Sequence, residues 1–102
     1  MADKEYQITC INKSDPSSKH EHITHIGNTF GNWRLTREDA IRRIEAGVEG
    51  FYTIDAVTLK KAVVAVVYEQ GKNPYLRTHA DGVWNDNLLA LPECSGDCTL
   101  VR

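Results

Sequence analysis

The sequence predicts an α+β fold: a small, twisted, mainly antiparallel sheet of about five strands with one helix packed on one face. Two observations lead to this prediction. An amphipathic helical segment follows Thr36, and the run Ala62–Tyr68 (AVVAVVY) is apolar at almost every position. The predicted order is strand, strand, helix, strand, strand, strand. At 102 residues, the chain (residues 1–102) is expected to form one domain around one core.

The N-terminal region predicts two paired strands. The segment over residues 6–12 (YQITCIN) alternates with period two and places four residues on one face: Tyr6, Ile8, Cys10 and Asn12. The polar stretch from Lys13 to Glu21 predicts a loop. Residues 22–27 predict a second, antiparallel strand. Because Ile23 and Ile26 are three apart, this strand is expected to contain a β-bulge.

A helix is predicted over residues 36–47. Thr36 is a good N-cap, and Asp39 completes a pair that resembles a capping box. Gly47 suits the position after the helix end. The apolar stripe of the helix comprises Ala40, Ile41, Ile44 and Val48. Two ion pairs at i,i+4 are expected to support it, Glu38 with Arg42 and Asp39 with Arg43.

Three further strands are predicted after the helix, over residues 51–54, 62–69 and 75–78. The second is apolar on both faces, so it is expected at the centre of the sheet and covered on both sides. The turn Gln70–Pro74 joins it to the third strand as a hairpin. Asp81 and Gly82 form a strong turn dipeptide, and Asp86 and Asn87 suit the cap of a helical turn over residues 88–91.

Charge and hydropathy exclude some classes of function. The chain has 12 basic and 14 acidic side chains and a net charge of -2, so no global field attracts nucleic acid or a membrane surface. No apolar run approaches the roughly 20 residues that cross a bilayer. The start of the chain lacks a signal-peptide pattern. We therefore expect a cytoplasmic protein with no membrane contact.

The chain has three cysteines. An odd number argues against a secreted disulfide framework and predicts three free thiols in a reducing compartment. A local bridge between Cys94 and Cys98 is conceivable under oxidation, and a loop this short would contribute little stability.

One set of residues in the predicted helix, the strands and the closing segment forms a recognisable pattern: Leu35, Thr36, Ala40, Ile41, Ile44, Gly47, Phe51, Tyr52, Val63–Val67, Tyr75, Leu76, Arg77, Thr78, Asp81, Asp86, Asn87, Leu88, Leu89, Leu91 and Pro92. With this pattern, residues 33–94 resemble the bacterial family called domain of unknown function 3892. The resemblance implies a fold, and an origin in bacteria or their mobile elements. It implies no catalytic residue.

Two groups of residues are candidates for metal binding or catalysis. His20 and His22 share one face if their segment is extended, and Cys94 with Cys98 would complete a tetrahedral set. The spacing matches no zinc signature, so a solvated loop is the better interpretation and we assign no metal site. His79 with Asp81 and Asp86 suggests an acid–base set. The sequence supplies no orienting third partner, and turn and cap roles explain these residues equally well.

Two groups of residues are candidates for binding. Trp33 precedes a helix that carries Arg42 and Arg43, which suits the stacking of bases. Neighbouring carboxylates cancel this field, so Trp33 is alternatively a lid on the core. The second candidate is a contact patch after the central strand, centred on Trp84 and Arg77 with His79, Tyr75 and Asp81. Trp84 folding back over the sheet is an equal alternative.

The sequence therefore predicts a small cytosolic interaction module, non-enzymatic and without cofactor, whose partner is a protein. One alternative is a nucleic-acid-associated or host-defence accessory protein, an inhibitor or regulator from a mobile element. A second is a small metal-dependent or hydrolytic enzyme. The sequence leaves the oligomeric state open.

Overall fold

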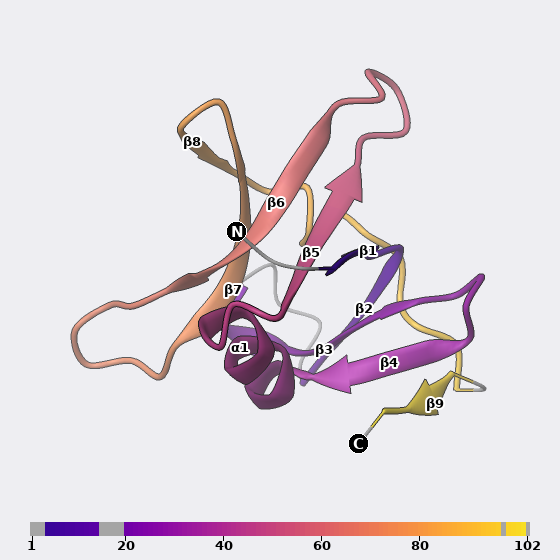
Figure 1. Cartoon of the computed structure of the whole chain (residues 1–102), viewed down its shortest axis with the longest axis horizontal. Helices are drawn as coiled ribbons and strands as arrows, with labels where there is room; N and C mark the ends of the chain where they lie inside the picture. Colours follow the sequence, from indigo (N-terminus) through magenta and orange to yellow (C-terminus); the bar gives the residue numbers. More distant parts are fainter. Residues whose placement is uncertain (1–3, 15–19, 97, 102) are drawn as a thin grey trace.

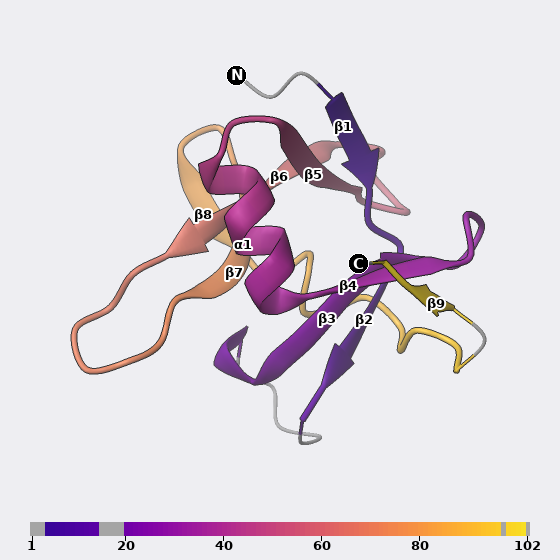
Figure 2. The same cartoon turned by 60° about the horizontal axis from the view of Figure 1, so that its bottom comes forward.

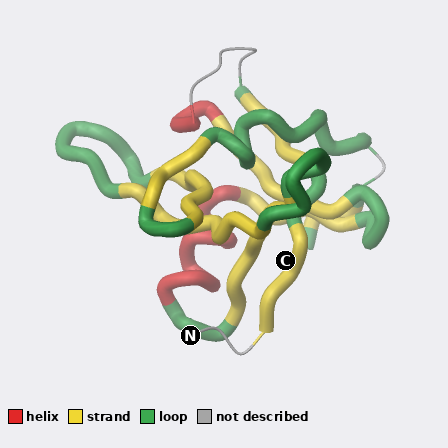
Figure 3. Tube along the Cα trace, turned by 90° about the horizontal axis from the view of Figure 1, so that it is seen from above, coloured by secondary structure: helices red, strands yellow, loops and turns green. Residues whose placement is uncertain are grey.

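A computed structural model describes residues 4–14, 20–96 and 98–101, so most of the predicted loop before Glu21 lies outside the described residues. The described residues form two sheets of mixed strand direction and one α-helix. Strands account for most of the regular secondary structure (Figure 3). The α+β class is confirmed. The single sheet of about five strands and the predicted order of elements are not.

The larger sheet has five strands in the order β1-β5-β6-β7-β8 (Figure 1). Their bounds are β1 Lys4–Gln7, β5 Glu49–Ile54, β6 Lys61–Val67, β7 Tyr75–Ala80 and β8 Val83–Asn85. β1 runs parallel to β5, and the other pairs are antiparallel. The predicted central position of the apolar strand is confirmed by β6. The strands predicted over 51–54 and 75–78 are longer than expected, and β8 was not predicted.

The smaller sheet has four strands in the order β2-β3-β4-β9. Their bounds are β2 Cys10–Lys13, β3 Ile23–Asn28, β4 Trp33–Thr36 and β9 Thr99–Leu100. The predicted bulge is confirmed: Asn12 pairs with His25 and Lys13 with Ile23, which leaves Thr24 as the extra residue. β4 and β9 were not predicted, because they are only four and two residues long.

The prediction of one strand over residues 6–12 is wrong, because the chain changes sheets in the middle of it. The amide of Ile8 donates to the carbonyl of Tyr52 in the larger sheet (2.7 Å), and the next amide, of Thr9, donates to Gly27 in the smaller sheet (2.9 Å). The alternation expected Ile8 and Ile11 on opposite faces. The crossing allows both to enter the core, where each is 1% exposed.

The predicted helix is confirmed as α1, Arg37–Glu45. The hydroxyl of Thr36 accepts a hydrogen bond from the amide of Asp39 at 3.1 Å. Gly47 adopts a positive φ of 73° just after the helix end, as a C′ residue does. Val48 lies beyond this turn and is 51% exposed, so its predicted place in the buried stripe is wrong.

The predicted pairing of the charged residues on α1 is partly confirmed. Arg43 pairs with Asp39 at 3.4 Å, as expected. Arg42 pairs with Asp39 as well, and Glu38 pairs with Arg37 at 2.8 Å rather than with Arg42.

A single core fills the space between the sheets. Its buried residues come from both sheets, from α1 and from the closing segment: Ile8, Ile11, Ile23, Ile26, Leu35, Ala40, Phe51, Val64, Leu76 and Leu88. α1 packs against β3 and β4 of one sheet and β5–β7 of the other (Figure 2). The helix therefore covers the inner face of the larger sheet. The prediction that β6 is covered on both sides is wrong, since Val63 on its other face is 39% exposed.

The prediction of three free thiols is wrong. Cys10 at the start of β2 forms a disulfide with Cys94, 84 positions later, and Cys98 is free and buried. The segment around Cys94 runs beside β2, where the amide of Cys94 donates to Ile11 and the amide of Ile11 donates to Pro92. Sequence spacing suggested only a local bridge between Cys94 and Cys98 under oxidation, whereas the fold brings Cys10 and Cys94 together.

We predict that reduction of this disulfide lowers the free energy of unfolding by about 3–5 kcal/mol, because the bond closes a long loop in the unfolded chain. Urea unfolding with and without dithiothreitol measures the effect. Cys94→Ser should resemble the reduced protein and lose its response to reductant, whereas Cys98→Ser should keep that response. An unchanged unfolding midpoint of the wild-type protein in reductant would contradict the prediction.

Candidate functional site

Four side chains form a continuous row across the larger sheet on the face away from the core. Tyr52 pairs with Val63, Val63 with His79, and His79 with Trp84. Directly paired residues on neighbouring strands share a face. Their sequence neighbours on β5, β6 and β7 are buried on the inner face, including Phe51, Val64 and Thr78. We call Tyr52, Val63, His79 and Trp84 the outer row.

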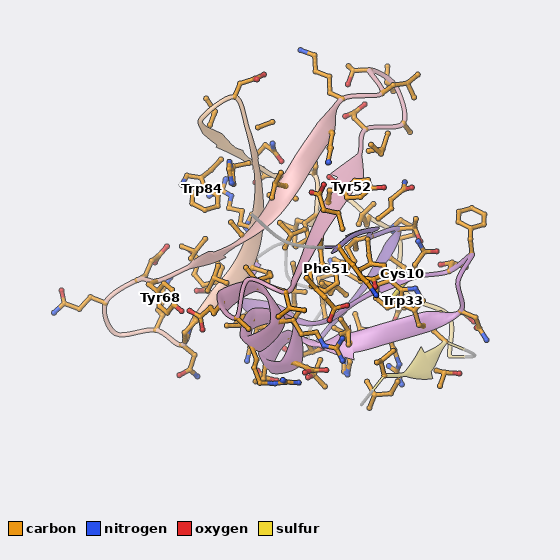
Figure 4. The ribbon with its side chains drawn as sticks, viewed as in Figure 1. Cys10, Trp33, Phe51, Tyr52, Tyr68 and Trp84 are labelled. Carbon is orange, nitrogen blue, oxygen red and sulfur yellow. A yellow bond between two sulfur atoms is a disulfide. The ribbon has the colours of Figure 1, made fainter. Side chains whose placement is uncertain are left out.

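The outer row is partly exposed. Val63 is 39% and Trp84 45% exposed. The rings of Trp84 and His79 meet edge to face with centroids 5.3 Å apart. Figure 4 shows Trp84 beside β8 at one edge of the sheet and Tyr52 on β5. Trp84 thus rests on its neighbour rather than in the core, and this arrangement presents a large aromatic surface.

A basic side chain flanks the row at each end. The ammonium of Lys61 lies 4.6 Å from the centre of the Tyr52 ring and 3.2 Å from the Glu5 carboxylate. At the other end Arg77 donates to the carbonyl of Asn85 at 3.2 Å and to the Asp86 carboxylate at 3.0 Å. Each cation is neutralised by one carboxylate, so the face has apolar and aromatic character with little net charge.

The turn between β7 and β8 sets the position of Trp84. Asp81 and Gly82 both have positive φ, 54° and 77°, as the two central residues of a type I′ hairpin turn require. The predicted turn is therefore confirmed, and Asp81 is an exposed turn residue. Asn85 anchors the far end of β8, since its side chain accepts hydrogen bonds from the Thr78 hydroxyl and from the amide of Asn87 (3.0 Å).

Besides Asp81 in the turn, two further predicted binding residues, Tyr75 and Trp33, lie apart from the row. Tyr75 is 6% exposed, and its hydroxyl donates to the Glu69 carboxylate. This hydrogen bond raises the pKa of Tyr75 and lowers that of Glu69, and it stiffens the β6–β7 hairpin. Trp33 lies on β4 and packs against Tyr6 and Phe51. It is the lid on the core that the sequence offered as one alternative.

The structure does not bring together the residues hypothesised to bind a metal ion, or those hypothesised to act as an acid–base pair. His20 and His22 belong to a short 3₁₀ helix, η1 (His20–His22), and Cys94 is bonded to Cys10. Within the described residues, no group of three His, Cys, Asp or Glu side chains could hold a metal ion. Asp86 contacts Arg77 and His20, the latter at 3.4 Å, whereas His79 packs against Trp84. Asp86 and His79 therefore have different partners.

One concave feature was missed in the sequence. A cavity of about 240 Å³ lies where β1, β4, β5 and α1 meet the end of the chain. Its walls include the rings of Tyr6, Trp33 and Phe51, with Arg43 and Glu49 as its charged residues. The sequence marks Trp33 and Phe51 as apolar. It carries no signal that residues from four separate elements meet.

Comparison with known proteins gives the family. The model of a family described as protein of unknown function (DUF3892) matches residues 7–92. The chain belongs to this family. The resemblance seen in the sequence is thereby confirmed over most of the chain. No curated protein and no solved structure matches the chain. Within the described part of the chain, no helix is both long and apolar enough to cross a membrane.

Two partly buried histidines link stability to pH. Burial, followed by the charge of Arg77, lowers the pKa of His20, and burial with Arg34 lowers that of His25. The pKa values of both histidines therefore lie below the ordinary value of about 6.5. A base with a lowered pKa in the folded state binds its proton more readily when unfolded. Its contribution to stability is complete above about pH 6.5 and is lost as the pH falls through the folded pKa.

We predict that the free energy of unfolding falls as the pH is lowered from 7.5 to 5.5, and that His20→Gln and His25→Gln each reduce this fall. Urea unfolding at pH 8.5, 7.5, 6.5 and 5.5 measures it. The measurements at pH 8.5 and 7.5 serve as the control, because His20 and His25 are neutral in the folded and unfolded states at these pH values. Equal slopes in the wild-type protein and both variants would show that other groups govern the acid response.

Proposed function

We propose that this protein is a non-enzymatic binding module whose outer row contacts a protein partner. The outer row is the main support for this proposal. Four cross-strand neighbours place two aromatic rings, an imidazole and a valine on the one face of the larger sheet that the core does not use. An exposed apolar surface of this kind is typical of an interaction site.

The composition of this face favours a protein over other partners. Tryptophan, tyrosine and arginine dominate the energy of protein contacts, and Trp84, Tyr52 and Arg77 lie on this face or at its rim. An apolar centre with charged groups at its ends matches the usual arrangement of an interface. The pairs of Lys61 with Glu5 and Arg77 with Asp86 supply such ends.

The rigidity of the face also supports the proposal. Tyr52, Val63 and His79 project from strands whose opposite side chains are fixed in the core, so little conformational entropy is lost when a partner binds. Trp84 is held by a type I′ turn on one side and by the Asn85 hydrogen bonds on the other. The surface therefore needs little rearrangement to bind.

A second candidate function is binding of single-stranded nucleic acid. The rings of Tyr52, His79 and Trp84 on one sheet face suit base stacking. The neutralised Lys61 and Arg77 and the net charge of -2 weigh against it, because phosphate contacts supply most of such affinity. An affinity for oligonucleotides that falls steeply with salt concentration would favour this alternative over the protein partner.

The absence of catalysis and a cytoplasmic location stay predictions. The acid–base set suggested by the sequence has no shared geometry, because Asp86 contacts Arg77 and His20 while His79 contacts Trp84. The Cys10–Cys94 bond argues against a cytoplasmic location, since disulfides persist mainly in oxidising compartments. The thiol state of the protein isolated under alkylating conditions decides the location question.

We predict that Trp84→Ala weakens partner binding by about 2 kcal/mol or more and changes the free energy of unfolding by less than about 1 kcal/mol, because the side chain is 45% exposed. The matched control is Phe30→Ala, which removes an aromatic side chain that is 91% exposed and lies next to the smaller sheet. Phe30→Ala should affect neither quantity.

A photoreactive amino acid at position 63 identifies the partner for this measurement. The cross-linked partner is purified, and its affinity for the wild-type protein, Trp84→Ala and Phe30→Ala is compared by calorimetry. A cross-link between two copies of the chain would make the partner a second protomer. Equal weakening by Phe30→Ala, or a loss of about 3–5 kcal/mol of stability in Trp84→Ala, would reject the outer row as the contact surface.

A further inference from the structure

The aromatic cavity lies on the opposite side of the larger sheet from the outer row. Phe51 and Tyr52 are consecutive in β5 and point to opposite faces, so Phe51 lines the cavity while Tyr52 belongs to the outer row. Figure 4 shows Trp33, Phe51 and Cys10 grouped where the two sheets meet. A ligand in the cavity would therefore not compete directly with a partner on the outer row.

We propose that this cavity binds a neutral, planar heteroaromatic ring, of which a nucleobase is the model. Its size is the first reason. Ligand pockets for drug-sized molecules span about 300–1,000 Å³, and this one has about 240 Å³. A single ring system fits this volume.

The second reason is the shape of its walls. Tyr6 and Trp33 meet edge to face, with centroids 6.1 Å apart and planes 79° apart. Phe51 lies 6.2 Å from Tyr6 and 6.5 Å from Trp33. Two rings at nearly right angles form a corner, in which a flat ligand stacks on one ring and meets the other with its edge.

The third reason is the pairing of charges beside the aromatic corner. The guanidinium of Arg43 lies 2.5 Å from the Glu49 carboxylate and 3.4 Å from Asp39, and Asp39 also binds the exposed Arg42. Two cations and two carboxylates leave no net charge. A charged ligand would have to break a pair or stay unpaired itself, which is costly in a partly buried site. A neutral ligand avoids both costs.

The fourth reason is that the cavity is lined by both donors and an acceptor. Arg43 lies in its wall, and a guanidinium carries five N–H donors. Glu49, which also lines the cavity, offers an acceptor for a ligand N–H. A nucleobase edge carries an acceptor beside a donor, and so can satisfy both groups.

Adenosine is the probe. Trp33 and Trp84 are the only tryptophans in the sequence, so in Trp84→Phe the fluorescence reports on Trp33 alone. We expect saturable quenching by adenosine with a Kd below about 1 mM. Benzyl alcohol lacks the donor–acceptor edge, choline is a cation and benzoate is an anion, and each should bind at least about 10-fold more weakly. Ribose 5-phosphate, which has no base, should not bind.

Calorimetry measures how substitutions in the aromatic walls of the cavity change the affinity for adenosine. Trp33→Leu should weaken adenosine binding by roughly 10-fold or more, because stacking on one ring is lost. Tyr6→Leu is the second variant if Trp33→Leu does not fold, and Trp84→Phe is the matched control that should leave the affinity unchanged. A short single-stranded oligoadenylate shows whether the natural ligand is a nucleic acid strand or a free nucleoside. If it binds more tightly than adenosine, the ligand is a nucleic acid strand. If it binds equally or more weakly, the ligand is a free nucleoside.

Three results would overturn the proposal. They are benzyl alcohol, choline or benzoate binding as tightly as adenosine, no saturable signal up to about 10 mM adenosine, and unchanged affinity in both folded wall variants. These results leave the outer row untouched, because the cavity lies on the other face of β5.

Discussion

The chain crosses from the larger sheet to the smaller sheet at Ile8 and Thr9, and this crossing holds the two sheets together. Because consecutive amides bond to different sheets, the inner faces of both sheets are fixed against each other and enclose one core. α1 closes one side of that core, and the Cys10–Cys94 bond ties the closing segment along β2 on the other. Among the described residues, the outer row takes no part in this packing, and Val63 and Trp84 are exposed.

Local signals in the sequence were enough for several elements. Thr36 and Gly47 mark the ends of α1, since their roles depend on the backbone nearby. Asp81 and Gly82 mark a type I′ turn for the same reason, and the apolar run of β6 from Ala62 to Val67 favoured the centre of a sheet. The spacing of Ile23 and Ile26 likewise predicted the bulge that places Thr24 outside the ladder.

Other features depend on contacts between distant residues, which local patterns do not encode. The alternation around Ile8 is the same for one strand as for two strands in different sheets. Cys10 and Cys94 are 84 positions apart, and nothing nearby in sequence relates them. For the candidate site, the sequence identified Trp84, Arg77 and His79 but missed Tyr52 and Val63. Only strand register brings these two into the same row.

We propose that the outer row, rather than the smaller sheet, is the surface that binds a protein partner. Two-dimensional NMR of isotope-labelled protein, titrated with the purified partner, tests this proposal residue by residue. We predict the largest shifts at Tyr52, Val63, His79 and Trp84, with small shifts at Trp33 and Phe30. Shifts concentrated around Phe30 and β4, with the outer row unchanged, would contradict it.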